Sequence, residues 1–510
     1  MKIFKHLRLI LVFTLFSIFM LQGSDHRSEL FAADTVFHEA QILENDSQYT
    51  EAYAQYNLCH KLFTNLKRAD EARQCILSAH RIDRIRAEYP YTESDILTIL
   101  SEKFQFIPEK ERLTWIKEGR LDHIMFDEKA HYYEYFYQNL LYRNLTLFHQ
   151  YSEKYPSKKP SFVGKLYDLA MGKYNHTFTP YINPKRFLLK GQMVFLRTEL
   201  PKEGILQLWI PIPIETAAQQ DLVIIHVEPD NYLKSTSSPN SDLGLLYFEI
   251  PLETLRTDLK IEVQVKFTCY QQQFTIDPSL VTDYEKDSDL YRTFTRSYAN
   301  TLITPEIQKK ADTIIEGITH PYFAAQKIYS TVINTIDYSF IPHLTLAELK
   351  QPESVYVHTH SYGDCGAQSL YFSALCRAAG IPARTTGGWQ LVPGLEGPHF
   401  WSEIYLPPYG WVPVDTTIAE TADLDLHLSS EENKAFKDYF FTHLDPYRMV
   451  IQNDIDIPLS PAPLEDVSYL IAIQSPAASC RSSDKDIDLL VKQRWEFNIT
   501  TIKELPGDIK

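Results

Sequence analysis

The spacing of apolar residues changes along this 510-residue chain, and each change predicts a different kind of structure. From about residue 40 to 155, apolar residues recur every three or four positions and glycines are few, which predicts helices. The segment PSKKPSFVGKL (156–166) interrupts that pattern and has the composition of a linker. Beyond it, apolar and polar residues alternate in at least five segments separated by Gly, Pro, Asn and Asp. Strands at this spacing predict an antiparallel β-sandwich.

Helical spacing resumes near Ser288 and is followed by strand-like segments up to the C-terminus. Helices that precede strands within one unit predict an α+β layout rather than a parallel α/β layout. We therefore expect a multidomain α+β protein. Its predicted parts are a leader (1–24), an N-terminal helical region (25–160), an antiparallel β-sandwich domain (161–285) and an α+β domain with a C-terminal extension (286–510).

Within the helical region, apolar residues from Tyr56 to Ala79 fit the spacing of one tetratricopeptide-like helical pair. His60 and Arg84 stand where that repeat carries a small residue and a proline. A single unit of this kind cannot build a solenoid. We therefore favour an ordinary helical bundle, whose function would be packing or partner binding.

The first residues have the pattern of an export signal. Lys2, Lys5 and Arg8 precede a 13-residue apolar run, Leu9 to Leu21, which is short for a bilayer span and typical of a signal-peptide core. We expect an exported protein that is periplasmic, extracellular or anchored to the membrane by this segment. The alternatives are an uncleaved anchor and a buried N-terminal helix.

Six cysteines in an exported chain raise the question of disulfides. Cys59 and Cys75 could join a helical hairpin, but the pairing cannot be read from the sequence. If Cys365 is a free thiol, five cysteines remain, so at least one more is free or bridges to another chain. The six are Cys59, Cys75, Cys269, Cys365, Cys376 and Cys480.

Cys365 stands at the start of a predicted helix, in the segment SYGDCGAQSLYFSALCRAAGIPART (361–385). Asp364 is a good N-cap residue, and Gly380 with Pro382 marks the end of the helix. The helix dipole and the free amides of the first turn stabilise a thiolate at this position, which is the nucleophilic form of cysteine. Cys376 lies further along the same helix, and we interpret it as a core residue.

A base and its orienting partner follow in the segment HFWSEIYLPPYGWVPVD (399–415). Two strand-like runs flank a Pro-Pro-Tyr-Gly turn, which predicts a hairpin. His399 and Asp415 have an index sum of 814, which centres the turn on residue 407 and brings the two side chains close together on adjacent strands. Alone, each of Cys365, His399 and Asp415 is most simply read as structural. In this order and spacing they can form a nucleophile, a base and an orienting group.

These two segments resemble the transglutaminase-like superfamily, which has a papain-like cysteine-protease core. GDCGAQSLYFSALCRAAGIPAR is similar to the nucleophile helix of that family, and HFWSEIYLPPYGWVPVDTT is similar to its His strand and terminal Asp. The resemblance covers roughly residues 290–420, extends weakly into LDPYRMVIQNDIDIPLSPAP, and makes 286–510 a transglutaminase-like catalytic domain. Gly366 stands where the animal crosslinking enzymes carry Trp, and no calcium-loop pattern is evident.

The resemblance implies that Cys365 is the nucleophile, His399 the general base and acid, and Asp415 the residue that fixes the imidazole. It implies acyl transfer from a peptide, isopeptide or glutamine amide through a thioester on Cys365. The backbone N–H of Cys365 is one oxyanion donor, and a second donor is not assigned. We favour hydrolysis over crosslinking because water competes unless an amine site excludes it.

The expected partner is a protein or peptide substrate, which could belong to the cell envelope. A net charge of -16 argues against a nucleic-acid partner, and a membrane would be contacted only through an uncleaved N-terminal segment. We expect no cofactor. We also expect no metal site, because His358 and His360 lack the spacing of helical ligands. The alternative function is a non-enzymatic exported binding or scaffold protein that retains a transglutaminase-like fold.

Overall fold

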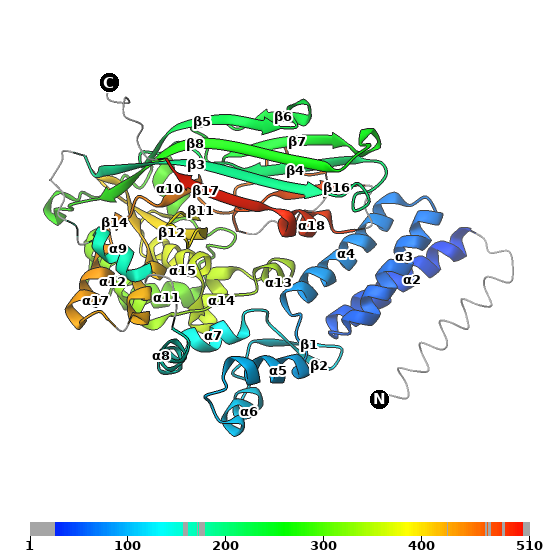
Figure 1. The fold of residues 1–510 in the computed structure, drawn as a ribbon, viewed down its shortest axis with the longest axis horizontal. Helices are drawn as coiled ribbons and strands as arrows, with labels where there is room; N and C mark the ends of the chain where they lie inside the picture. The colour runs from blue at the N-terminus through cyan, green and yellow to red at the C-terminus, as the bar shows by residue number, and fades with distance from the viewer. Residues whose placement is uncertain are drawn as a thin grey trace. The chain divides into compact units, whose positions relative to one another are not determined.

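A computed structural model describes residues 26–156, 162–170, 172, 179–425, 427–464, 467, 471–481 and 485–502. The chain forms two compact units, residues 1–134 and 135–510 (Figure 1). The predicted leader 1–24 lies outside the described residues. Among the residues described, no helix combines the length and the hydrophobicity that crossing a bilayer requires.

The first unit is mainly helical, as the apolar spacing predicted. Three successive helices pack on a core that includes Tyr56 and Phe63, and Cys59 forms a disulfide with Cys75 across two of these helices, with a Cα–Cα distance of 6.2 Å. Its elements are α2 (His26–Asn45), α3 (Tyr49–Asn65), α4 (Ala69–Glu88), α5 (Glu93–Lys103), α6 (Glu109–Lys117), β1 (His123–Phe126) and β2 (Lys129–Tyr132). Within the described residues, Cys269, Cys365, Cys376 and Cys480 form no disulfide.

The second unit contains a β-sandwich made of two antiparallel sheets that share one apolar core (Figure 1). In the first sheet the order is β5 (Gln219–Glu228), β8 (Leu259–Gln273), β3 (Tyr181–Phe195) and β17 (Glu496–Thr501), with β14 (His443–Leu444) at the end of β8. In the second sheet the order is β16 (Ala477–Cys480), β4 (Ile205–Pro211), β7 (Leu245–Pro251) and β6 (Leu233–Thr236).

The C-terminal segment returns to this sandwich. β16 pairs with β4 and β17 pairs with β3, while α18 (Ile487–Arg494) adds Ile487 and Val491 to the sandwich core. Each sheet therefore contains strands from both ends of the second unit. The domain boundaries at 160 and 285 remain predictions, and the structure adds that the last strands of the chain belong to the sheets of the 161–285 segment.

The rest of the second unit is an α+β module in which the buried helix α15 packs on a four-stranded antiparallel sheet. The sheet order is β13 (Gly410–Val414), β12 (Gly397–Leu406), β11 (Ala383–Gln390) and β15 (Arg448–Gln452). The helices are α7 (Phe136–Tyr142), α8 (Leu145–Lys154), α9 (Phe162–Ala170), α10 (Asp289–Thr295), α11 (Pro305–Ile314), α12 (Pro321–Thr335), α13 (His343–Glu348), α14 (Glu353–His360), α15 (Cys365–Ala378), α16 (Thr416–Glu420) and α17 (Ser430–Tyr439). A short parallel pair, β9 (Asp337–Tyr338) and β10 (Tyr362–Gly363), lies just before α15. The predicted fold class, mixed α+β with antiparallel sheets, is confirmed.

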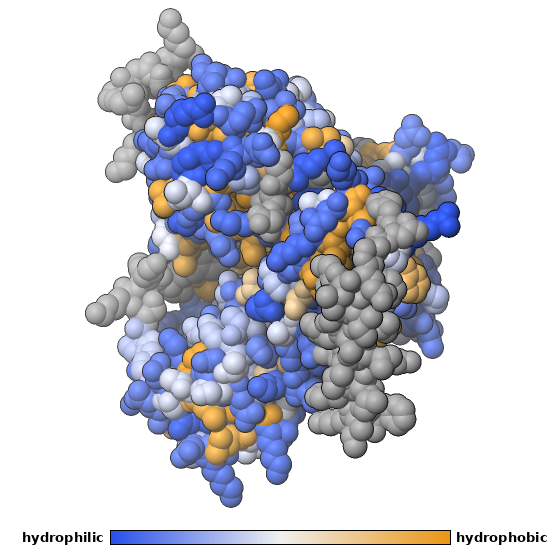
Figure 2. All heavy atoms as spheres, turned by 90° about the vertical axis from the view of Figure 1, so that its right-hand side faces the viewer, coloured by the Kyte–Doolittle hydropathy of each residue, from blue (hydrophilic) through white to orange (hydrophobic). Residues whose placement is uncertain are grey.

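The visible face in Figure 2 is mostly polar, with apolar side chains in small groups. Phe31 and Ile42 on α2 are examples of exposed apolar residues in the described part of the chain. Scattered exposure of this kind is ordinary for globular proteins, so it does not mark a binding surface.

Candidate active site

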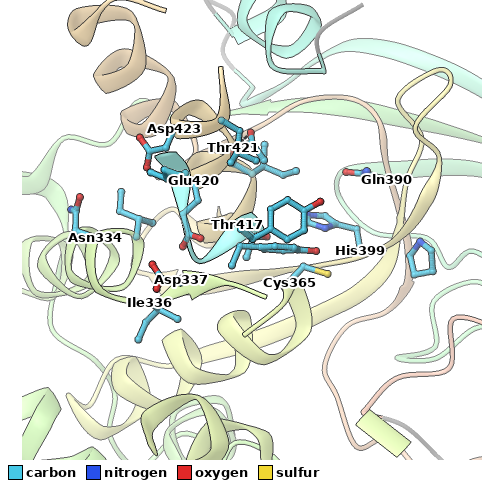
Figure 3. A pocket seen from close by; sticks show the side chains of 17 residues that line it. Asn334, Ile336, Asp337, Cys365, Gln390, His399, Thr417, Glu420, Thr421 and Asp423 are labelled. Atoms are coloured by element: carbon cyan, nitrogen blue, oxygen red, sulfur yellow. Dashed lines mark hydrogen bonds between the residues drawn. The ribbon is translucent and has the colours of Figure 1, made fainter. Parts of the chain in front are cut away.

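A cavity of about 410 Å³ opens beside the N-terminus of α15 (Figure 3). Figure 3 shows Cys365 and His399 on one side of it, and Asp337, Glu420 and Asp423 on the opposite side. The segment that follows β13 supplies much of one wall. The lining residues are Tyr142, Leu145, Ile333, Asn334, Ile336, Asp337, Tyr338, Cys365, Gln390, Pro398, His399, Thr417, Ile418, Glu420, Thr421, Asp423 and Leu424.

Cys365 is the first residue of α15, as the sequence predicted. Asp364 caps the helix, because its Oδ1 accepts hydrogen bonds from the backbone N–H groups of Gly366 (3.0 Å) and Ala367 (3.2 Å). A side chain on Gly366 would meet the Ile471 side chain at 2.8 Å and the Phe400 ring at 3.2 Å. Glycine therefore stands at this position, where the crosslinking enzymes carry Trp, because the space is already filled.

The ionisation of Cys365 differs from the sequence-based expectation of a thiolate. Burial raises the pKa of its thiol well above the ordinary value, and the neighbouring Asp364 carboxylate raises it further, while the backbone amide of Phe400 offsets part of the shift. Burial and the capping carboxylate thus outweigh the helix dipole. The resting form is a neutral thiol, which needs a base to become a nucleophile.

His399 lies on β12 and is bound to Asp415. Its Nε2–H donates to Asp415 Oδ2 at 2.8 Å, and the side chain is 5% exposed. The predicted hairpin of β12 and β13 is present, with Ser402 opposite Val414 and therefore an index sum of 816 rather than 814. Asp415 accordingly follows the end of β13 instead of lying directly opposite His399, and its side chain still reaches the imidazole.

The structure brings the three predicted residues together to different extents. His399 and Asp415 are in direct contact, and Cys365 lines the same cavity as His399. Within the described residues, no hydrogen bond joins the thiol to the imidazole. Catalytic hydrogen bonds are often long in unliganded enzymes, so this arrangement is compatible with a cysteine–histidine pair.

Asp415 is fully buried and holds its charge because the Arg448 guanidinium and the His399 imidazole contact it. Burial would raise its pKa, but His399 and Arg448 together lower it well below the ordinary range. Arg448 Nη1 donates to Asp415 Oδ2 at 2.6 Å, and its Nε and Nη2 donate to Asp445 at 2.9 and 2.7 Å. The Trp401 ring lies 6.2 Å from the His399 ring and 5.6 Å from the Arg448 guanidinium.

Sequence reasoning missed Arg448 and Asp445. Both lie in LDPYRMV, which was interpreted only as a weak continuation of the family resemblance. The Asp-x-x-Arg spacing could have suggested an ion pair, but nothing local indicates that the pair meets Asp415 some 30 residues earlier. Only the packing of β15 beside β11 brings Arg448 to the site.

Tyr338 also lies at the cavity and was not singled out from the sequence. The β9–β10 pair places it opposite Gly363, two residues before Cys365. Burial raises the pKa of its hydroxyl well above the ordinary value, and the neighbouring Cys365 raises it further. The raised pKa keeps the hydroxyl protonated. Among the described residues it has no hydrogen-bond partner, so it can donate to a group bound in the cavity that Tyr338 lines.

The opposite wall is acidic. Glu420 Oε2 accepts from Gln368 Nε2 at 3.1 Å, and its Oε1 is buried without a hydrogen-bond partner in the described chain. Burial raises the pKa of Glu420 well above its usual value, and Asp337 and Asp423 raise it further. Asp423 is paired with Lys437 at 2.7 Å.

Metal ligation was considered for the described histidines. His358 and His360 use their Nδ1 atoms toward the Tyr371 hydroxyl and the Tyr356 carbonyl, respectively. A different group, His226, Glu228 and Glu262, lies close enough to share an ion on the outside of the sandwich. That group is remote in sequence from Cys365 and plays no part in the cavity's lining.

Comparisons with known proteins found a family match over part of the chain and similarities of low identity to other proteins. Residues 308–416 match the Transglutaminase-like superfamily. An uncharacterised protein of Haemophilus influenzae is 24% identical over 306 residues, which are 51% of this chain and 77% of that protein. A solved structure from Cytophaga hutchinsonii, titled as a candidate cysteine protease, has a TM-score of 0.40 and 15% identity and covers 63% of this chain and 92% of its own. The periplasmic domain of TgpA from Pseudomonas aeruginosa has a TM-score of 0.23 and 13% identity and covers 54% and 96%.

The buried Asp415 generates a prediction about stability and pH. Its folded-state pKa is depressed, so its charge contributes stability above the unfolded pKa of about 3.9, and this contribution is lost as the pH falls through the folded value. We expect Asp415→Asn to lower the free energy of unfolding by about 3 kcal/mol at pH 7, since the buried Arg448 loses one of its two carboxylate partners. Urea unfolding at pH 7 and at steps from pH 5 to 2 measures it. The difference between wild type and variant should shrink below pH 4, and a difference that is constant with pH would contradict the assignment.

Proposed function

We propose that the transglutaminase-like domain of this chain, matched over residues 308–416, is a thiol enzyme that takes acyl groups from amides. The observation that carries the proposal is the shared cavity of Cys365 and His399, with Asp415 bonded to the far side of the imidazole. Peptide, isopeptide and glutamine side-chain amides are the proposed substrate class. Water is the proposed acceptor, so the reaction is a hydrolysis.

His399 supplies the base that the neutral thiol requires. Because Nε2 donates to Asp415, Nδ1 is the nitrogen left to accept the Cys365 proton. As the proton moves to Nδ1, the sulfur forms a bond to the carbonyl carbon of the substrate. The imidazolium then returns the proton to the leaving amine while the C–N bond breaks, which leaves a thioester on Cys365. Water, deprotonated by His399, attacks the thioester and releases the acid and the thiol.

The buried ion cluster supports this proton transfer. Asp415 and Asp445 carry two negative charges, and Arg448 carries one positive charge. With a neutral imidazole the cluster has a net charge of -1, and with an imidazolium it is neutral. The imidazolium formed when the thiol attacks would therefore meet a net negative charge in the buried cluster, which stabilises it.

Two donors are available for the oxyanion of the tetrahedral intermediate. The first is the backbone N–H of Cys365, which lies in the first turn of α15, where helix amides lack partners within the helix. The second, in our proposal, is the hydroxyl of Tyr338, which lies opposite Gly363 and has a raised pKa. A hydroxyl that stays protonated in a buried site is suited to donate to a developing negative charge.

Transfer to an amine is the second candidate reaction, and the acidic wall supports it. Asp337, Glu420 and Asp423 lie across the cavity from Cys365 (Figure 3). Carboxyl oxygens in this position would accept hydrogen bonds from an amine, which could then compete with water for the thioester. Adding glycinamide to the assay separates the two, since hydrolysis yields the acid and transfer yields the glycinamide amide.

The thioester can be tested with p-nitrophenyl acetate, an activated acyl donor that needs no substrate recognition. We expect a burst of p-nitrophenol and an acetyl group on the peptide that contains Cys365, detected by mass spectrometry. Cys365→Ala should abolish both. His399→Ala should slow acylation by about 10³-fold, because the neutral thiol then lacks its base. Cys480→Ala, at a buried cysteine of β16 that forms no disulfide in the described structure, is the matched control and should acylate normally. Equal acylation of wild type and His399→Ala would favour the alternative of a non-enzymatic binding protein.

The role of Tyr338 predicts a specific kinetic change. Tyr338→Phe removes one oxyanion donor and should lower kcat about 10²-fold with KM nearly unchanged, because the lost bond forms only in the transition state. Tyr142→Phe is the control, since Tyr142 lines the same cavity and packs edge-on against Tyr338 with ring centroids 5.2 Å apart. A comparable loss in both variants would indicate a packing effect instead of oxyanion stabilisation.

We also propose that the chain is exported. The N-terminal apolar run supports it, and so does the Cys59–Cys75 disulfide, because structural disulfides persist in oxidising compartments. In the full chain expressed in a bacterium, we expect Cys59 and Cys75 to be oxidised and the protein to fractionate with the envelope or periplasm. Deletion of residues 1–24 should leave both thiols open to alkylation. Full oxidation of the deletion variant in the cytoplasm would remove this support.

A further inference from the structure

His343 lies between two carboxylates at the start of the helix that carries Cys365. Its Nε2 is 2.5 Å from Asp364 Oδ2 and its Nδ1 is 2.7 Å from Glu353 Oε1. The imidazole is 24% exposed, and the two carboxylate side chains are 8% and 4% exposed. A ring that donates from both nitrogens carries both protons, so this geometry is that of an imidazolium.

The electrostatic surroundings agree with that charge. Burial lowers the pKa of His343, but Asp364 and Glu353 outweigh burial and raise it well above the ordinary value. Burial also raises the pKa of Glu353, and the neighbouring His343 offsets part of that rise. Behind Glu353, Asp456 accepts two hydrogen bonds from Asn300 and has a pKa raised to about 6 by burial.

Asp364 connects this ion group to the nucleophile. Its Oδ1 caps α15 through Gly366 and Ala367, while its Oδ2 is held by His343. One carboxylate thus bonds the helix on one side and the imidazolium on the other. The same carboxylate raises the pKa of the Cys365 thiol, so any positive charge that balances Asp364 makes the thiol easier to ionise.

We infer that His343 is a positioning residue for Cys365: its imidazolium holds Asp364 in the capping position and balances the charge of that carboxylate beside the thiol. The inference rests on the proposed function, in which Cys365 must lose its proton to react. It assigns a role to a residue that contacts neither the cavity lining nor the His399–Asp415 pair in the described structure. The contact that links His343 to the start of α15 is its bond to Asp364, so substitution of Asp364 tests the link.

The test measures the ionisation of Cys365 without any substrate. The rate of alkylation of Cys365 by iodoacetamide is followed from pH 6 to 10 by mass spectrometry of its peptide. In His343→Gln, which keeps a donor but loses the charge, the profile should move up by about one pH unit, or about tenfold in rate at a fixed pH. In an Asp364→Asn background, the same substitution should move it by much less, because the imidazole has then lost the carboxylate that contributes most to holding its second proton.

Several results would overturn the inference. One is an alkylation profile that His343→Gln leaves unchanged. Another is an equal displacement with and without Asp364→Asn, which would indicate a purely structural effect. His360→Gln, at an exposed histidine that ends α14, is the control and should leave the profile unchanged. If His343→Gln does not fold, His343→Asn provides the second variant. It also removes the charge and should displace the profile in the same direction, and a displacement to lower pH would contradict the inference.

The outcome is independent of the acylation assay. His343→Gln could displace the alkylation profile as expected in a protein that p-nitrophenyl acetate does not acylate. That result would contradict the proposed function and support the effect of His343 on Cys365. Normal acylation with no response to His343→Gln would remove only the role of His343.

Discussion

A buried carboxylate at the end of β13 is the interaction on which the site depends. Asp415 has no exposed surface, so its charge persists only because His399 and Arg448 meet one of its oxygens. Its other oxygen accepts from the backbone N–H of Ile418 at 3.0 Å and so begins α16, which forms part of the cavity wall. One side chain therefore joins the strand that carries the base, a strand from a later part of the chain, and the wall opposite the nucleophile.

The features that local sequence predicts well are those with local causes. Asp364 caps α15 because its carboxylate reaches amides two and three residues ahead, and the hairpin of β12 and β13 follows from one turn. The contact between His399 and Asp415 depends on that hairpin. The predicted register differs from the observed one by two in the index sum, and the two side chains still meet. The mixed α+β class could likewise be predicted, because each element shows its own periodicity.

Other features arise from pairings that no local pattern encodes. Arg448 reaches the site because β15 pairs with β11, where Gly388 lies beneath the Met449 backbone too closely for any side chain. Tyr338 is placed by a two-residue parallel pair, and His343 is placed by a carboxylate 21 positions away. The ionisation of Cys365 was misjudged for a related reason, since burial depends on the whole fold whereas the helix dipole can be inferred from one segment.

The return of the C-terminal segment to the sandwich has a consequence for biosynthesis. β4 and β3 lack one neighbour each until β16 and β17, which come much later in the sequence, have been made. Until then both sheets present an open edge and an incomplete core. A nascent chain therefore cannot close this sandwich until those two segments have been made, and before then the open edges are exposed to edge-to-edge association.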